Sequence, residues 1–191
     1  MNQFQIYLIG VGGQGIGLLS ETILRAIDHA GIPVKSVDTH GLAQRGGTVS
    51  SHIRMGESIY SPLIREGSAD MVLALEIHEA YRAFLQMLKP GGTLVYYKTS
   101  LQPLAVRLGK EKKITPEFLE QVSKQKGCQC IGVVNRSLPD SRMENMVVLK
   151  AISEHQLIPG VTLENYSQAL QDLLSGKTLE ENINLLQNKG E

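Results

Sequence analysis

The sequence predicts an α/β fold, a three-layer Rossmann-like sandwich with a mixed, mostly parallel sheet and an inserted β-hairpin. Three observations lead to this prediction. An apolar strand runs through a glycine-rich turn into a helix at the N-terminus, continuous apolar segments then alternate with amphipathic helical segments, and one antiparallel pair interrupts that alternation. With 191 residues, 42% of them hydrophobic, we expect a single domain over residues 1–191.

The first unit is the apolar run 4–9, the glycine-rich segment 10–15 and a helical pattern from Ile16 to Ala30. Glycine lets a ligand lie against the backbone, and a helix start directs unpaired N–H groups and a positive dipole end toward that ligand. A phosphate or carboxylate site is therefore predicted here. The alternative is a tight turn with only a structural role. The candidate ligand-binding residues are Gly10, Gly12, Gly13, Gln14 and Gly15.

A second strand, 34–38, ends at Asp38, where a dinucleotide-binding fold would hold a ribose hydroxyl. The segment 39–48 lacks the helical pattern that should follow such a strand, and it combines three glycines with polar and basic side chains. Such loops are typical of binding sites, although a solvated turn remains the alternative. The candidates for a crevice or a subunit interface are His40, Gln44, Arg45, Gly46 and Gly47.

The alternating segment 49–55, the turn 56–58 and the returning segment 59–64 predict the inserted β-hairpin. His52 and Arg54 share one face of its first strand, either as functional groups or as its solvated side. Regular alternation then resumes, and Glu76 follows a strand end as a further candidate; an exposed glutamate at a helix start is the alternative. The later elements are a strand at 71–75, a helix at 77–88, a strand at 93–97, a helix at 116–126, a strand at 131–134, and helices at 142–154, from 162, and from 178 with a Thr178/Glu181 capping box.

Composition excludes several classes. Nineteen basic and nineteen acidic residues give no net charge, so no nucleic-acid partner is expected. No apolar run approaches the ~20 residues of a membrane span, and the N-terminus lacks the basic region of a signal peptide, which indicates a cytoplasmic protein without a membrane partner. Cys128 and Cys130 are too few for a four-thiolate site, so we expect no bound metal and interpret them as half-buried strand residues.

Three blocks together carry a resemblance. Residues 10–16, 40–49 and 145–149 resemble the gamma-type subunit of the 2-oxoacid:ferredoxin oxidoreductase family, and the likeness spans nearly the whole chain with C-terminal helices from about 162. The first two blocks are more specific as a pair than either is alone. The resemblance implies a gamma-type catalytic domain that acts in an oxidoreductase on an aryl 2-oxoacid such as indolepyruvate, giving an acyl-CoA, carbon dioxide and reduced ferredoxin.

The resemblance also implies which subunit holds each cofactor. A large partner subunit would hold thiamine diphosphate and iron–sulfur clusters, ferredoxin would act through the complex, and coenzyme A would be the cosubstrate. This chain would bind none of these cofactors alone and supply no catalytic residue of its own. Two alternatives remain open: a stand-alone NAD(P)- or FAD-dependent oxidoreductase that uses Asp38, and a non-catalytic nucleotide-binding module.

Overall fold

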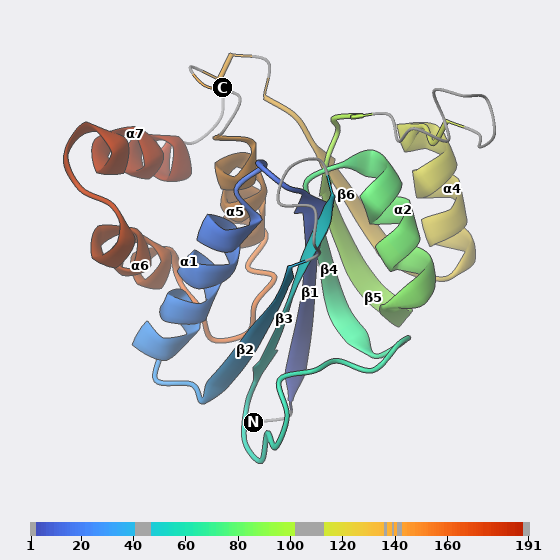
Figure 1. Ribbon diagram of the computed structural model, residues 1–191, viewed down its shortest axis with the longest axis horizontal. Coiled ribbons are helices and arrows are strands. Elements are labelled where there is room, and N and C mark those ends of the chain that lie inside the picture. The colour runs from blue at the N-terminus through green and yellow to red at the C-terminus, as the bar shows by residue number, and fades with distance from the viewer. Residues whose placement is uncertain are drawn as a thin grey trace.

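The computed structural model describes residues 3–40, 47–101, 113–135, 137–138, 140 and 143–188. Its centre is a six-stranded sheet with the order β2-β3-β1-β4-β5-β6. Helices α1, α5, α6 and α7 cover one face and α2 and α4 cover the other, so the predicted three-layer α/β sandwich is confirmed (Figure 1). The strands are β1 (Phe4–Val11), β2 (Val34–His40), β3 (Thr48–Met55), β4 (Ala69–Ala74), β5 (Leu88–Tyr97) and β6 (Gln129–Val133). The helices are α1 (Ile16–His29), α2 (Ile77–Gln86), α4 (Pro116–Gln125), α5 (Glu144–Glu154), α6 (Leu163–Leu173) and α7 (Gly176–Gln187).

Five strands run in one direction and β3 alone runs against them. β1 pairs in parallel with β4, β4 with β5, and β5 with β6, whereas β3 pairs antiparallel with both β1 and β2. The carboxyl ends of β1, β4, β5 and β6 therefore meet at one edge of the sheet, the upper edge in Figure 1. Ligands bind at this edge in open α/β folds.

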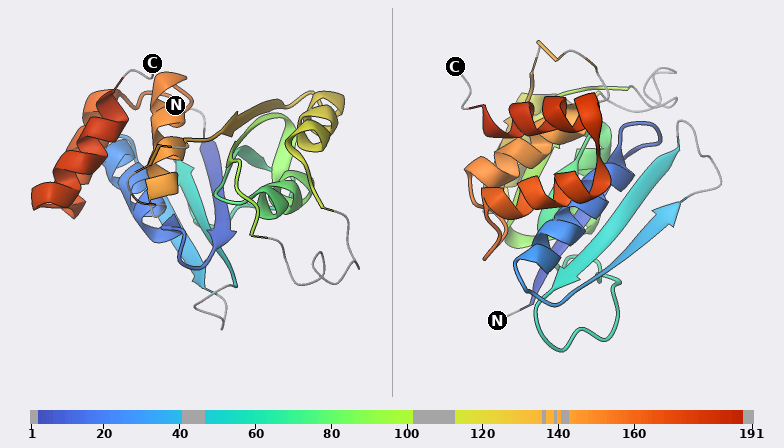
Figure 2. Two further views of the ribbon diagram at one scale, coloured as in Figure 1. Left: turned by 90° about the horizontal axis from the view of Figure 1, so that it is seen from above. Right: turned by 90° about the vertical axis from the view of Figure 1, so that its left-hand side faces the viewer.

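Two apolar clusters hold the layers together. One packs the α1, α5 and α6 side chains on their face of the sheet, and the other packs α2 and α4 on the opposite face. The turned views in Figure 2 show α6 and α7 lying outside α1 and α5 as an added outer layer.

Among the described residues, no helix is both long and apolar enough to cross a membrane.

The predicted antiparallel strand over residues 49–55 is present as β3, but the segments that pair with it differ from the predicted one. β3 pairs with β2 and β1, and residues 59–64 form no strand. That segment is held by side chains instead, because Arg54 Nη1 donates to the carbonyl of Ser61 at 2.8 Å and the Ile64 N–H donates to His52 Nδ1 at 3.1 Å. The prediction of strand 59–64 was wrong because these side chains satisfy backbone groups that a ladder would otherwise pair.

Two further boundaries differ from the sequence prediction. β5 begins at Leu88 and runs through Gly92, where a Cβ would lie 2.9 Å from the carbonyl of Asp70, so this glycine serves a close strand approach rather than a helix stop. α7 begins at Gly176, so the predicted Thr178/Glu181 capping box was wrong. The capping box lies at α6, where Thr162 and Asn165 bond reciprocally.

Candidate functional site

The glycine loop leads from β1 into α1 at the carboxyl edge of the sheet. Gly13 and Gly15 have φ values of +105° and +80°, which only glycine adopts without strain. Gly15 is the N-cap of α1 and gives the helix no side-chain cap. Among the described residues, the N–H groups of Gly12 and Gln14 have backbone acceptors and that of Gly13 has none. The loop therefore presents free backbone donors at a helix start.

The side chain of Gln14 fastens this loop to the sheet. Its Oε1 accepts from the Val11 N–H at 2.8 Å, and its Nε2 donates to the carbonyl of Leu75 at 2.7 Å. Both ends of the amide are thus engaged between the ends of β1 and β4. The Gln14 side chain therefore holds the glycine loop against the sheet.

Two other glycines of the loop are sites of close packing. A Cβ at Gly10 would lie 2.9 Å from Ile16 Cδ1, and one at Gly15 would lie 2.7 Å from Asn145 Nδ2. Asn145, on α5, donates from Nδ2 to the carbonyl of Gly15 at 3.2 Å. Its Oδ1 is buried without a hydrogen-bond partner in the described part of the chain. The sequence analysis did not select Asn145 as a site residue, although it opens the third block of the family resemblance.

The first two blocks of the family resemblance, residues 10–16 and 40–49, contact each other in the structure. The Gly12 N–H donates to the carbonyl of Gly47 at 2.9 Å, and Val11 lies opposite Thr48 in the β1–β3 ladder. Gln44, Arg45 and Gly46 lie outside the described residues. The backbone of His40 ends β2 opposite Val49, and its side chain also lies outside the description.

Three titratable side chains lie beside this edge at the start of α2. Glu76 is 1% exposed; its Oε2 accepts from the His78 N–H at 2.7 Å and its Oε1 lies 2.8 Å from His78 Nδ1. Glu76 is thus the buried N-cap of α2, which favours a structural role over a catalytic one. Sequence reasoning missed His78 and Glu79. No periodic signal distinguishes them from surface positions of an amphipathic helix.

Glu79 connects α2 to the start of β3. Its Oε1 accepts from Thr48 Oγ1 at 3.3 Å and pairs with Arg82 at 3.0 Å. Burial raises the pKa of the Glu79 carboxyl above its ordinary value, although Arg82 acts in the opposite direction. Because Thr48 lies opposite Val11, this carboxyl lies close to the glycine loop.

Asp38 is not placed as a dinucleotide-binding acid would be. β3 lies between β2 and β1, so Asp38 is one strand removed from the strand that carries the glycine loop. Its Oδ1 accepts from Ser20 Oγ at 3.4 Å. This arrangement disfavours the NAD(P)- or FAD-dependent alternative.

The two cysteines do not fit an iron–sulfur cluster. Both are free; Cys128 is buried just before β6 and Cys130 is partly buried within it, so only one of them is a strand residue. Burial raises the pKa of the Cys130 thiol, which disfavours the thiolate that a metal requires. The described residues contain no group of three or more His, Cys, Asp or Glu side chains arranged to hold a metal.

The sequence matches one known protein family over nearly its whole length. The family model for pyruvate ferredoxin/flavodoxin oxidoreductase matches residues 5–188. The chain belongs to this family. Among curated proteins, the chain is similar to the indolepyruvate oxidoreductase subunit IorB of Archaeoglobus fulgidus, to which it is 31% identical over 96% of this chain and 92% of the relative. The IorB subunit of Thermococcus kodakarensis is 36% identical over 57% of this chain and 54% of the relative.

Solved structures show the same fold. The gamma subunit of a keto/oxoacid ferredoxin oxidoreductase from Geobacter sulfurreducens superposes with a TM-score of 0.67 at 20% identity, over 96% of this chain and 94% of that one. A 2-oxoglutarate:ferredoxin oxidoreductase from Magnetococcus marinus, solved with 2-oxoglutarate, coenzyme A and succinyl-CoA, superposes with a TM-score of 0.67 at 21% identity, over 97% of this chain but 30% of that one. In the latter, the fold is one part of a longer chain.

Proposed function

We propose that this chain is the small subunit of a cytoplasmic indolepyruvate:ferredoxin oxidoreductase. The observation that carries the proposal is the 31% identity to an IorB subunit over nearly the full length of both chains. The reaction would convert an aryl 2-oxoacid and coenzyme A into an acyl-CoA and carbon dioxide. The two electrons released would pass to ferredoxin.

The redox and carbanion chemistry belongs to a partner subunit in this proposal. This chain has two cysteines, which cannot supply the four thiolates of a cluster, and they lie in or next to β6, which β4 and β5 separate from β1. Thiamine diphosphate bound to the large subunit would supply the carbanion stabilisation that decarboxylation requires. The role of this chain is to bind and orient a substrate group and to complete the interface.

The glycine loop is the part of this chain suited to a phosphate, such as one of those of coenzyme A. The Gly13 N–H lacks an acceptor among the described residues, and the uncapped start of α1 adds a positive dipole end. The Gln14 amide and the Asn145 contact fix this loop before a ligand arrives. A preformed loop loses little conformational entropy when it binds.

The loop from His40 to Gly47 is the proposed contact with the partner. Its end is anchored at the glycine loop through the Gly12–Gly47 hydrogen bond. Gln44 and Arg45 are the side chains of this loop that we propose to contact the partner. An arginine there would hold a carboxylate or phosphate through two parallel hydrogen bonds, which lysine cannot reproduce.

The test is co-expression of this chain with the thiamine-binding large subunit encoded by the same organism. We expect a stable complex that reduces ferredoxin or methyl viologen with indolepyruvate and coenzyme A, and that uses aryl 2-oxoacids better than pyruvate or 2-oxoglutarate. The large subunit alone is the control. A complex that prefers pyruvate would overturn the substrate assignment, and equal activity without this chain would overturn the subunit assignment.

A further inference from the structure

A cavity of about 300 Å³ opens at the carboxyl end of β5, beside the first turn of α4. One wall is formed by Lys98, Thr99 and Ser100, which follow β5, and the other by residues 113–117. The cavity lies at the same edge of the sheet as the glycine loop, because β1 and β5 run in the same direction (Figure 1). None of the loop residues lines it, so the two places are separate.

Two lysines, Lys98 and Lys113, line this cavity. Lys98 comes from the first wall and Lys113 from the second. Neither ammonium group forms a hydrogen bond or salt bridge with any residue that the structure describes, whereas Lys89 and Lys126 both have such partners. Two ammonium groups lining one cavity repel each other unless an anion lies between them.

The backbone of β6 leaves room for Lys98. A Cβ at Gly132 would overlap the Cε of Lys98 and would approach the hydroxyl of Tyr96 to 2.7 Å. The aliphatic part of Lys98 therefore crosses β6 where that strand has no side chain. This contact limits the positions available to its ammonium group.

One acidic residue also lines the cavity. Glu117 is fully exposed, and the pKa of its carboxyl is lowered by its own backbone N–H, by the Thr115 hydroxyl and, to a smaller extent, by Lys98. Glu117 is thus ionised at neutral pH, and two lysines outnumber it. The lining side chains carry a net charge of about +1.

The buried pair at the start of α2 holds both walls. Glu76 Oε1 accepts from the Leu101 N–H at 3.1 Å, and His78 Nε2 accepts from the Ile114 N–H at 3.3 Å. The Ile77 N–H also donates to the carbonyl of Thr99 at 3.0 Å. These bonds attach segments on either side of the cavity to the same helix, α2.

We propose that this cavity is a second anion site, which binds a phosphate or carboxylate group of a small ligand between Lys98 and Lys113. The hydroxyls of Thr99 and Ser100 are the neutral donors at its wall. Charge-assisted hydrogen bonds from two ammonium groups favour an anion over a neutral ligand. The proposal does not depend on the glycine loop.

The test is amide NMR of the full chain titrated with inorganic phosphate and, separately, with acetate. We expect saturable shifts at Thr99, Ser100 and Lys113 with at least one of the two anions. Lys98→Gln should weaken that binding about ten-fold, and Glu117→Gln should strengthen it about two- to five-fold by removing a competing charge. Lys124→Gln, at the far end of α4, is the charge-matched control and should change nothing.

Two larger probes identify the source of the anion. Adenosine 3′,5′-bisphosphate carries the phosphate chemistry of a nucleotide, and phenylpyruvate carries the carboxylate of an aryl 2-oxoacid. Each probe is compared in wild type, Lys98→Gln and Gly12→Val, since the last substitution lies in the glycine loop, which does not line the cavity. Wall shifts that survive Gly12→Val but are lost in Lys98→Gln support the proposal. Absence of wall shifts with both simple anions, or equal binding by wild type and Lys98→Gln, would overturn it.

Discussion

Asn145 Nδ2 donates to the carbonyl of Gly15 at 3.2 Å, although 130 positions separate the two residues. This bond connects α5 to the N-cap of α1, and the absence of a side chain at Gly15 makes it possible. A residue of the third block of the family resemblance therefore supports the start of α1, where a phosphate is proposed to bind.

The first prediction concerns this pair. Gly15→Ala should destabilise the chain by about 2–3 kcal/mol, because it combines left-handed backbone strain with a contact at 2.7 Å. In an Asn145→Ala background the additional cost of Gly15→Ala should fall by about 1 kcal/mol, since the contact is gone. Urea unfolding of the four proteins measures this coupling. Gly13→Ala is the control: its Cβ meets nothing within 4 Å, so it should be additive with Asn145→Ala.

The second prediction concerns Gln14. Gln14→Glu replaces the donor to the Leu75 carbonyl with an acceptor, so it should destabilise the chain by about 2–3 kcal/mol while keeping the side-chain length. Gln171→Glu, on the exposed face of α6, makes the same chemical change without a buried partner and should cost less than about 0.5 kcal/mol. Thermal unfolding at pH 7 compares them. Equal melting temperatures would contradict the scaffold role of Gln14.

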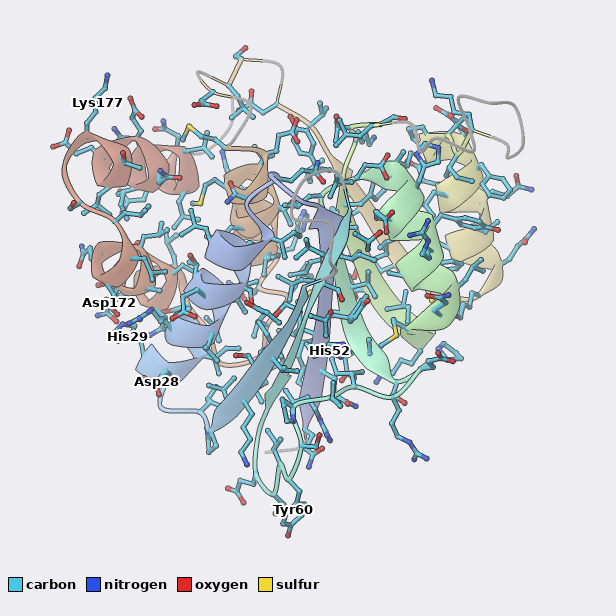
Figure 3. All side chains as sticks on the ribbon, in the orientation of Figure 1. Asp28, His29, His52, Tyr60, Asp172 and Lys177 are labelled. Carbon is cyan, nitrogen blue, oxygen red and sulfur yellow. The ribbon has the colours of Figure 1, made fainter. Side chains whose placement is uncertain are left out.

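The third prediction concerns His52, shown among the side chains in Figure 3. Burial lowers the pKa of its imidazole below the ordinary 6.5, and Nδ1 must be unprotonated to accept from the Ile64 N–H. The unfolded chain therefore takes up this proton more readily, so stability should be present above pH 6.5 and decrease as pH falls below it. We expect His52→Gln to flatten this pH dependence in urea unfolding between pH 7.5 and 5.5.

The fourth prediction concerns Arg45 in the proposed partner loop. Arg45→Ala should change the stability of the isolated chain by no more than about 0.5 kcal/mol. In the complex it should cost about 2–5 kcal/mol in association or in transition-state stabilisation, because it leaves a desolvated anion without a partner. Arg45→Lys should recover only part of this. Complex yield and 2-oxoacid-dependent viologen reduction measure both effects, and wild-type behaviour of both variants would show that Arg45 is a solvated loop residue.

The elements with a single strong signal were predictable from sequence. The helix after Ile16 and the apolar run at 71–75 lie where periodicity and apolar content placed them. The pairing of residues 49–55 was not predictable in the same way, because alternation shows that a segment suits a strand but does not choose its neighbour. The side chains of His52 and Arg54 form hydrogen bonds with the backbone of residues 61–64, so that segment does not pair with β3 as a strand.

The candidate site shows a similar division. The glycine motif predicted the strand, turn and helix correctly, and the second block meets the first at Gly12 and Gly47. Other roles depend on contacts between residues far apart in sequence, such as Gln14 with Leu75. This holds for Gln14, for Asn145 and for the Glu76–His78 pair. A motif gives residue spacing along the chain, and these contacts arise only when the sheet order brings separate segments together.

The position of β1 inside the sheet constrains how the chain folds as it leaves the ribosome. β1 is made first, yet both of its neighbours, β3 and β4, come from residues 48–55 and 69–74. The first strand must therefore wait, apolar and unpaired, until these later segments emerge, and the Gln14 bond to Leu75 requires the same delay. This edge of the sheet cannot be complete before Leu75 has emerged, so a ligand of the kind proposed for the glycine loop would stabilise only chains in which Leu75 is already free to fold.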